Sequence, residues 1–283
     1  MTAQIVVNGL VWSAIIALMA VGFTLIFGIL RVVNYWHGEA YMFGAVAVFY
    51  LCVVLGVPYY LSLFLAVLAV GLLGWAVDKA IFQHLRGNLM GSAVASLGLL
   101  MVFQNVMWYV LGPRARSVPS VLPGTLVIGG ASISAERLFI TCASFAVIAF
   151  LYWFVNKTTL GKMMRAVQQD REAALAFGID VDRVCGITFG MATGLAALAG
   201  GLVSPIFSIS PPMGGTPLLL ALVVVILGGM GSVVGAIIAA FIIGFQQSIT
   251  GIYLGSHIGL TISAGIALVI LTIRPRGLLG HAA

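Results

Sequence analysis

The stretch IVVNGLVWSAIIALMAVGFTLIFGIL, residues 5–30, contains no charged side chain. A helix needs roughly 20 apolar residues to cross the hydrocarbon core of a bilayer, so this run is long enough to span it. Backbone N–H and C=O groups in lipid must be satisfied within the segment, which predicts an α-helix. Because no basic region precedes the run and no clear small-residue cleavage site is present, we interpret it as a retained span and not as a signal peptide.

The composition extends this prediction to the whole chain. Hydrophobic residues make up 62% and charged residues 7% of the 283 residues, whereas soluble domains carry about 25% charged residues. The apolar runs are continuous and lack the alternating pattern, in segments of about ten residues, that is typical of barrel strands. The sequence therefore predicts an all-α, polytopic helical membrane protein, with one transmembrane domain over residues 1–283.

Nine apolar runs are candidate spans: Ile5–Leu30, Ala40–Gly56, Tyr59–Val77, Ser92–Leu111, Leu138–Val155, Val184–Ser204, Thr216–Met230, Val233–Gly251 and Ile258–Ile273. The run Thr216–Met230 is short and follows several prolines, so it either spans the membrane or re-enters it, and the predicted count is eight or nine. In the sixth run Gly186, Gly190 and Gly194 lie on one helix face. Such a face packs closely on a helix of the same chain or of a partner subunit.

The basic residues predict the orientation, because cytoplasmic loops carry an excess of Lys and Arg. We place the charged segment 157–183 in the cytoplasm, and with nine spans the N-terminus then lies outside and the C-terminus inside. The other residues that this places inside are Arg31, Lys79, Arg86, Arg274 and Arg276. Three arginines in the loop 112–137 fall outside, which departs from the rule.

The chain has 13 basic and 7 acidic residues, and nine of these charged residues lie in the segment Lys157–Arg183. Its spacing predicts one amphipathic helix that begins after Gly161 and ends at Gly178, followed by a turn in which Asp180 or Asp182 caps the next span. The expected apolar stripe consists of Met163, Ala166, Val167, Ala173, Ala174 and Phe177. Such a helix either anchors the chain at the membrane surface or docks a soluble partner.

The stretch EAALAFG within this segment resembles the first half of the EAA motif of ABC-importer permeases. Glu172, Ala173 and Ala174 match its Glu-Ala-Ala, and Gly178 matches its glycine. The Leu-Pro pair of the second half is absent, which argues against the commonest importer class.

Other stretches resemble the LivH-type permeases of branched-chain amino acid ABC importers. The opening GLVWSAIIALMAVGFTLIFGILRVVNYWHGEAYMFGA (residues 9–45) is similar to that family's Asn-Phe-Ala-His-Gly-Glu run, with Tyr35 and Trp36 in place of the usual pair. Further similar stretches are SLGLLMVFQN (96–105), ILGGMGSVVGAIIAAFIIG (226–244) and RPRGLLG (274–280). The resemblance covers essentially the whole chain in order.

The resemblance implies a division of labour among several proteins. The chain would be one of two membrane permeases in a bacterial inner membrane, driven by two cytoplasmic ATPases and supplied by a periplasmic binding protein. The segment 157–183 would couple it to the ATPases, and no cofactor or nucleic acid is implied. The expected coupling residues are Gly161, Arg165, Asp170, Glu172, Ala173, Ala174 and Gly178.

Polar residues within the apolar runs are candidates for a substrate path, because ionisable groups at membrane depth are costly and often functional. Asn34, His37 and Glu39 stand at the start of the second run, where they either serve the path or cap a helix with Glu39 in its first turn. Gln104 and Asn105 lie in the fourth run, where they either bond another helix or meet a polar substrate.

The sequence carries no catalytic set. It has no GxxxxGK[ST] phosphate-binding loop, no GxSxG elbow and no metal-ligand spacing, so we expect a permease that is not an enzyme and binds no metal. Related importers carry urea, amides or small carboxylates, and these substrates remain alternatives to branched-chain or other neutral amino acids. A self-sufficient secondary transporter is a further alternative, although it would need paired intramembrane ionisable residues.

Overall fold

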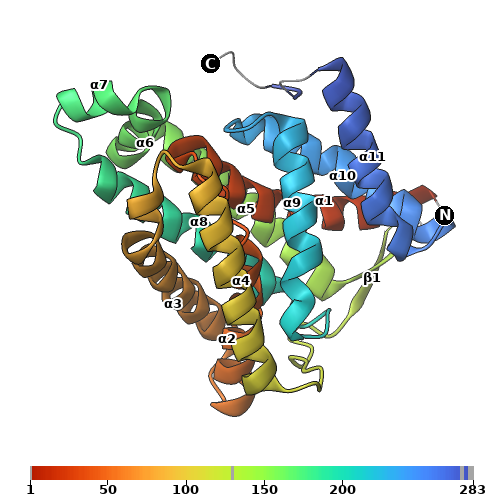
Figure 1. Cartoon of the computed structure of the whole chain (residues 1–283). Helices are drawn as coiled ribbons and strands as arrows, with labels where there is room; N and C mark the ends of the chain where they lie inside the picture. The colour runs from red at the N-terminus through yellow and green to blue at the C-terminus, as the bar shows by residue number, and fades with distance from the viewer. Residues whose placement is uncertain (1, 129–130, 275–276, 280–283) are drawn as a thin grey trace.

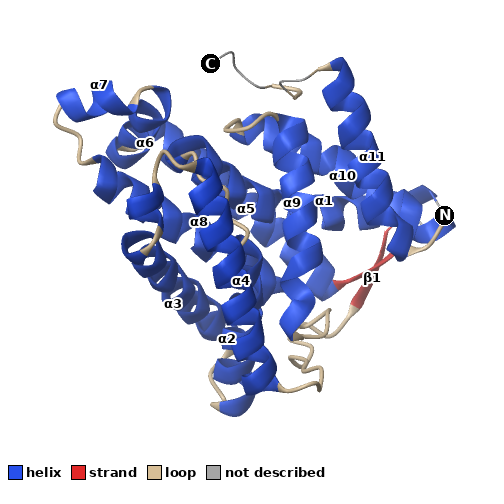
Figure 2. Cartoon of the chain, in the orientation of Figure 1, coloured by secondary structure: helices blue, strands red, loops and turns tan. Residues whose placement is uncertain are grey.

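The computed structural model describes residues 2–128, 131–274 and 277–279, and within them the chain is almost entirely helical (Figures 1 and 2). The long helices are α1 (Thr2–Leu25), α2 (His37–Phe49), α3 (Tyr59–Ala80), α4 (Leu89–Leu111), α5 (Ala135–Lys157), α8 (Val181–Val203), α9 (Gly215–Gly228), α10 (Val233–Tyr253) and α11 (Ser256–Ile273). The short elements are α6 (Thr159–Gln169), α7 (Arg171–Ala176), the π-helical turns η1 (Ile26–Leu30) and η2 (Tyr50–Val54), and the 3₁₀ turns η3 (Phe82–Leu85) and η4 (Pro211–Gly214). The predicted all-α class is confirmed.

Helix α1 forms the buried centre of the bundle. It packs against α5, α8, α9 and α10, and 89% of its most apolar stretch is buried. A helix that is apolar on all sides can lie against lipid or protein in a membrane, and α1 is covered by protein. Small residues allow neighbouring helices to approach α1 closely. Ser13 contacts Gly244 of α10, and Gly22 contacts the carbonyl of Ala192 in α8.

Helices α2 and α8 cross where a glycine of each helix lies against the backbone of the other. A Cβ on Gly44 would overlap the backbone of Ala197, and one on Gly200 would overlap the carbonyl of Tyr41. Lipid removes most of the hydrophobic drive between helices, so such close backbone approach is a main source of packing energy.

We expect Gly44→Ala to lower the free energy of unfolding by about 1–3 kcal/mol, because the added methyl meets backbone that cannot move aside. Thermal denaturation of the purified chain in mild detergent measures this. Gly98→Ala in α4 is the matched control, since a Cβ there meets nothing within 4 Å. Equal melting temperatures for the two variants would contradict the prediction.

The regularly spaced glycines of α8 pack within the chain. Gly190 lies against the carbonyl of Gly71, and Gly186 lies against the ring of Trp75, both in α3. Of the two interpretations given to this spacing, contact with a helix of the same chain is confirmed.

The loops gather at two ends of the bundle. At one end, the carbonyl of Gly231 accepts from Gln168 Nε2 at 3.0 Å, and the carbonyl of Leu227 accepts from the N–H of Leu278 at 2.8 Å. We call this the inner end. At the other, the outer end, Arg116 and Ile209 pair through their backbones.

Eight helices of the described residues are long and apolar enough to cross a membrane, and Pro211–Gly228 is one of them. It ends at the inner end near Leu227, and its length and composition favour the spanning interpretation of Thr216–Met230 over the re-entrant one. The ninth helix, α11, has a shorter apolar part, Ile258–Ile273. Arg276 lies outside the described residues, as do Pro275 and Gly280 of the RPRGLLG stretch.

Some predicted boundaries and one loop differ from the structure. Helix α2 begins at His37 and not at Ala40, and α8 begins at Val181 because the Asp180 side chain caps it by accepting from the N–H of Arg183 at 3.0 Å. The outer loop 112–137 contains an antiparallel hairpin, β1 (Thr125–Ile128) and β2 (Ala131–Ser134), which was not predicted.

Candidate functional site

The charged segment forms two helices instead of one. Asp170 is extended, with φ −150° and ψ 111°, and its Oδ1 accepts from the N–H groups of Glu172 and Ala173 at 2.9 and 3.0 Å. An aspartate that satisfies the first N–H groups of a helix starts a new helix. Asp170 therefore ends α6 and caps α7, and the prediction of a single helix was wrong.

Helix α6 is fixed to the bundle by the side chains that face inward. Gly161, Met164 and Val167 are buried, and a Cβ on Gly161 would overlap the carbonyls at the end of α5. Arg165 donates to Asn156 Oδ1 at 2.6 Å. Gly161 and Arg165 thus hold α6 against the end of α5 and do not project from the surface.

Helix α7 stands at the inner end (Figure 1), and apolar side chains on it and directly after it are exposed. Phe177 is 87% exposed and Leu175 is 53% exposed. Phe177 was predicted to share one apolar stripe of a single helix with Met163, but the chain breaks into two helices at Asp170 and Phe177 follows the second. Ala174 is buried and Ala173 partly buried, whereas Glu172 is exposed and forms no ion pair with the described residues. Gly178, with φ +78°, follows α7 as the predicted C′ glycine.

An ionic cluster at the inner end was not found from the sequence. Arg86, just before α4, pairs with Asp78 of α3 and with Asp182 of α8. Asp78 lies near the end of α3 and is buried. The sequence shows this carboxylate directly after an apolar run, but its partner Arg86 is identified only by the folded structure.

The start of α2 lies deep within the bundle. His37 Nε2 is 3.3 Å from the carbonyl of Met19, which lies well inside α1. The non-helical residues 31–36 therefore return from the inner end into the membrane. Irregular backbone at that depth is tolerated where protein buries it, and Val32, Asn34 and Trp36 are buried.

Asn34, His37 and Glu39 are all buried at this helix start. Both polar atoms of the Asn34 side chain, Nδ1 of His37 and Oε2 of Glu39 have no hydrogen-bond partner among the described residues. Trp36 precedes α2, and no side chain caps the helix there. The interpretation of Asn34 or His37 as caps is wrong, whereas Glu39 does lie in the first turn.

Glu39 faces helix α4. Trp36 and Phe43, three residues before it and four after, share its side of α2. Both rings contact Phe103 of α4, with centroid distances of 5.8 and 5.4 Å. By helical spacing, Glu39 therefore lies on the side of α2 whose aromatic residues contact Phe103 of α4.

Helix α4 covers this region loosely. Of its residues only Ser92, Ser96 and Leu111 are buried. Gln104 is partly buried beside Phe103, whereas Asn105 is exposed and donates to the carbonyl of Met101 at 2.7 Å. Gln104 is thus partly covered next to the residue of α4 that contacts α2, whereas Asn105 is turned to the exposed side.

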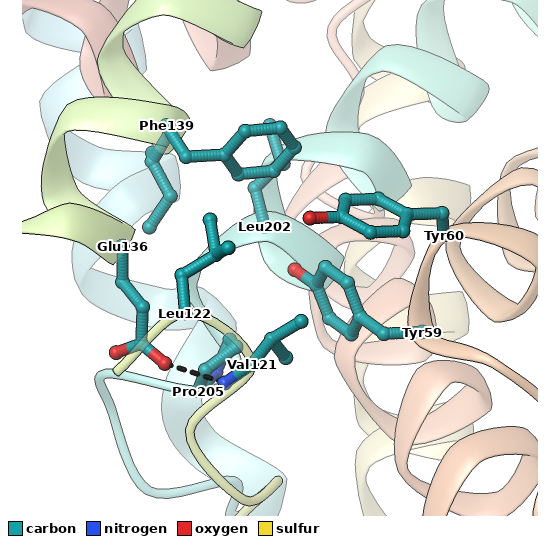
Figure 3. Close-up of a pocket in the computed structure, with 9 residues that line it drawn as sticks. Tyr59, Tyr60, Val121, Leu122, Glu136, Phe139, Leu202 and Pro205 are labelled. Atoms are coloured by element: carbon teal, nitrogen blue, oxygen red, sulfur yellow. Dashed lines mark hydrogen bonds between the residues drawn. The ribbon is translucent and has the colours of Figure 1, made fainter. Parts of the chain in front are cut away.

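A small hollow at the outer end lies between the starts of α3 and α5 and the end of α8 (Figure 3). Glu136 closes one side, where its Oε1 accepts from the N–H of Val121 at 2.8 Å. The cavity is about 10 Å³, which holds roughly one water molecule. It is too small for an amino acid.

Comparison with known proteins finds permeases that are similar to this chain in sequence. BraD of Pseudomonas aeruginosa, a high-affinity branched-chain amino acid transport system permease protein, is 28% identical over 98% of this chain and 95% of its own length. LivH of Escherichia coli K12, described in the same words, is 28% identical over 97% and 94%. A probable LivH permease of Methanocaldococcus jannaschii is 27% identical over 98% and 92%.

A solved structure shares the fold. PsaBC from Streptococcus pneumoniae, in complex with Fab, superposes with a TM-score of 0.56 at 13% identity, over 98% of this chain and 97% of that chain. The family model described as "Branched-chain amino acid transport system / permease component" matches residues 5–273. With nearly its whole length matched, the chain belongs to the family of branched-chain amino acid transport system permease components.

Proposed function

We propose that this chain is a membrane subunit of an ATP-driven importer and translocates branched-chain or other neutral amino acids. Permeases of this family are non-catalytic membrane components of binding-protein-dependent ABC importers, which have ATPase and substrate-binding partners. The observation that carries the proposal is the α6–α7 element, a helix pair that stands outside the bundle at the inner end with Phe177 exposed.

We assign the segment 157–183 as the coupling part of a single permease domain, residues 1–283. Phe177 and Leu175 form an apolar knob, and Glu172 lies beside them on α7. Apolar anchors ringed by polar groups are typical of docking sites. The partners assigned to this side are two cytoplasmic ATPases, which places it at the cytoplasmic face of a bacterial inner membrane.

The substrate path is assigned to the region between α2 and α4. A buried carboxylate without a cation is costly at membrane depth, and the described residues give Glu39 no ion pair. A zwitterionic amino acid carries an ammonium group that would pair with Glu39. Asn34, His37 and Gln104 would supply further polar contacts.

A second permease subunit is assigned to the exposed face of α4. Asn105 and Trp108 lie exposed on it among apolar side chains such as Met101 and Leu97. An amide is poorly placed against lipid, and a second subunit would cover it. A similar but distinct permease would complete the pair, and a periplasmic binding protein would deliver substrate at the outer end.

Uptake by the complete complex tests the function. We expect proteoliposomes that contain this chain, its co-purifying subunits, the binding protein and internal ATP to take up leucine, isoleucine or valine. Uptake should fall to background when ATP is omitted. Uptake of urea, amides or small carboxylates in place of amino acids would overturn the substrate class, and uptake without ATP would overturn the importer mechanism.

A further inference from the structure

Arg86 joins two parts of the chain that are far apart in sequence. One of its guanidinium nitrogens contacts Asp78 Oδ2 at 2.5 Å, and the other contacts Asp182 Oδ1. Only 2% of the Arg86 side chain is exposed. A planar guanidinium is suited to holding two carboxylates at once, which a lysine cannot do in the same way.

Asp182 is the exposed end of this cluster. It lies in the first turn of α8, directly after the turn that follows α7, and its side chain is 51% exposed. Arg171, at the start of α7, approaches the same carboxylate at 3.7 Å, and Gln83 donates to it at 3.3 Å. Asp182 thus connects the α7 helix to the loop between α3 and α4.

Arg86 stands three residues before α4. Between them Gly87 has φ +89° and Asn88 caps α4 by accepting from the N–H of Gly91 at 2.8 Å. Helix α4 is mostly exposed and touches only α2, η3 and η4 substantially within the described residues. Its inner end is therefore held chiefly through this short connection.

We propose that Arg86 is a positioning residue that transmits movement of the α6–α7 segment to α4, through Asp182. A partner that shifts α7 displaces Asp182, and the buried guanidinium passes the displacement to the inner end of α4. Helix α4 then moves relative to α2, whose Glu39 it covers. This inference rests on the proposed coupling role of the segment 157–183.

Asp182→Asn tests the link, because it removes the charge on the α8 side and leaves Arg86 paired with Asp78. In the complete complex we expect ATPase co-purification and ATP hydrolysis to persist, while substrate transported per ATP hydrolysed falls about tenfold. Asp182→Glu retains the carboxylate and should restore most of the ratio. Arg183→Gln is the matched control, an adjacent exposed charge without an ion pair among the described residues.

A second measurement tests whether Arg86 and Asp182 act through one link. Arg86→Gln combined with Asp182→Asn should lower the ratio no further than Arg86→Gln alone, because both changes break one link. An unchanged transport-to-ATP ratio in Asp182→Asn would overturn the inference while leaving the importer function intact. If the wild-type chain instead purifies without any ATPase subunit, the coupling role of the segment 157–183 itself is overturned.

Discussion

Phe177→Ala is expected to weaken binding of the ATPase subunits about 100-fold. An exposed aromatic anchor that fills a partner's pocket contributes roughly 2–4 kcal/mol to an interface, which corresponds to about 30- to 1000-fold in affinity. Because 87% of Phe177 is exposed in the isolated chain, its removal should cost little folding stability. Co-purification of the ATPases from membranes, followed by titration of purified ATPase onto the immobilised permease, measures the loss.

Two variants make this result specific. Tyr253→Ala removes an aromatic side chain that is 64% exposed at the outer end of α10, and it should leave ATPase binding unchanged. Leu175→Ala, on the same knob as Phe177, should give a smaller loss in the same direction. Full ATPase binding by Phe177→Ala would show that α7 is a surface anchor, which is the other interpretation of the segment.

The helices were predictable because lipid imposes a simple rule on the sequence. Uncharged runs near 20 residues must be helices, and this rule located the long helices of the bundle. The rule located the ends of the helices less well, because capping residues determine where a helix begins and ends. Asp170 divides the charged segment, and Asp180 starts α8 before its apolar run begins.

The candidate site was predictable only in part, because its contacts depend on how the helices pack. Asn34, His37 and Glu39 were recognised as polar residues at the start of an apolar run, but their burial depends on how α2 packs against its neighbours, including the contact of His37 with α1 and the contacts of Trp36 and Phe43 with Phe103 of α4. Arg86 and Asp182 are 96 positions apart. Nothing local in the sequence pairs them, and the exposure of Phe177 likewise depends on the turn at Asp170.

Glu39→Gln is expected to lower amino acid uptake by at least 30-fold. Glutamine keeps the shape of the side chain but removes the charge that would pair with the substrate's ammonium. Removing one partner of a buried, hydrogen-bonded charge pair typically costs about 2–5 kcal/mol. Initial rates of uptake of radiolabelled leucine in proteoliposomes measure the effect, with ATPase content held equal between samples.

Glu136→Gln provides the matched control, because Glu136 is also a carboxylate near a span but accepts a backbone hydrogen bond at the outer end. It should retain most of the uptake. Glu39→Asp keeps the charge and should lie between the wild type and Glu39→Gln. If Glu39→Gln transports at the wild-type rate, Glu39 is a structural residue of the first turn of α2. A path between α2 and α4 would then have to recognise its substrate through Asn34, His37 and Gln104, without a fixed charge.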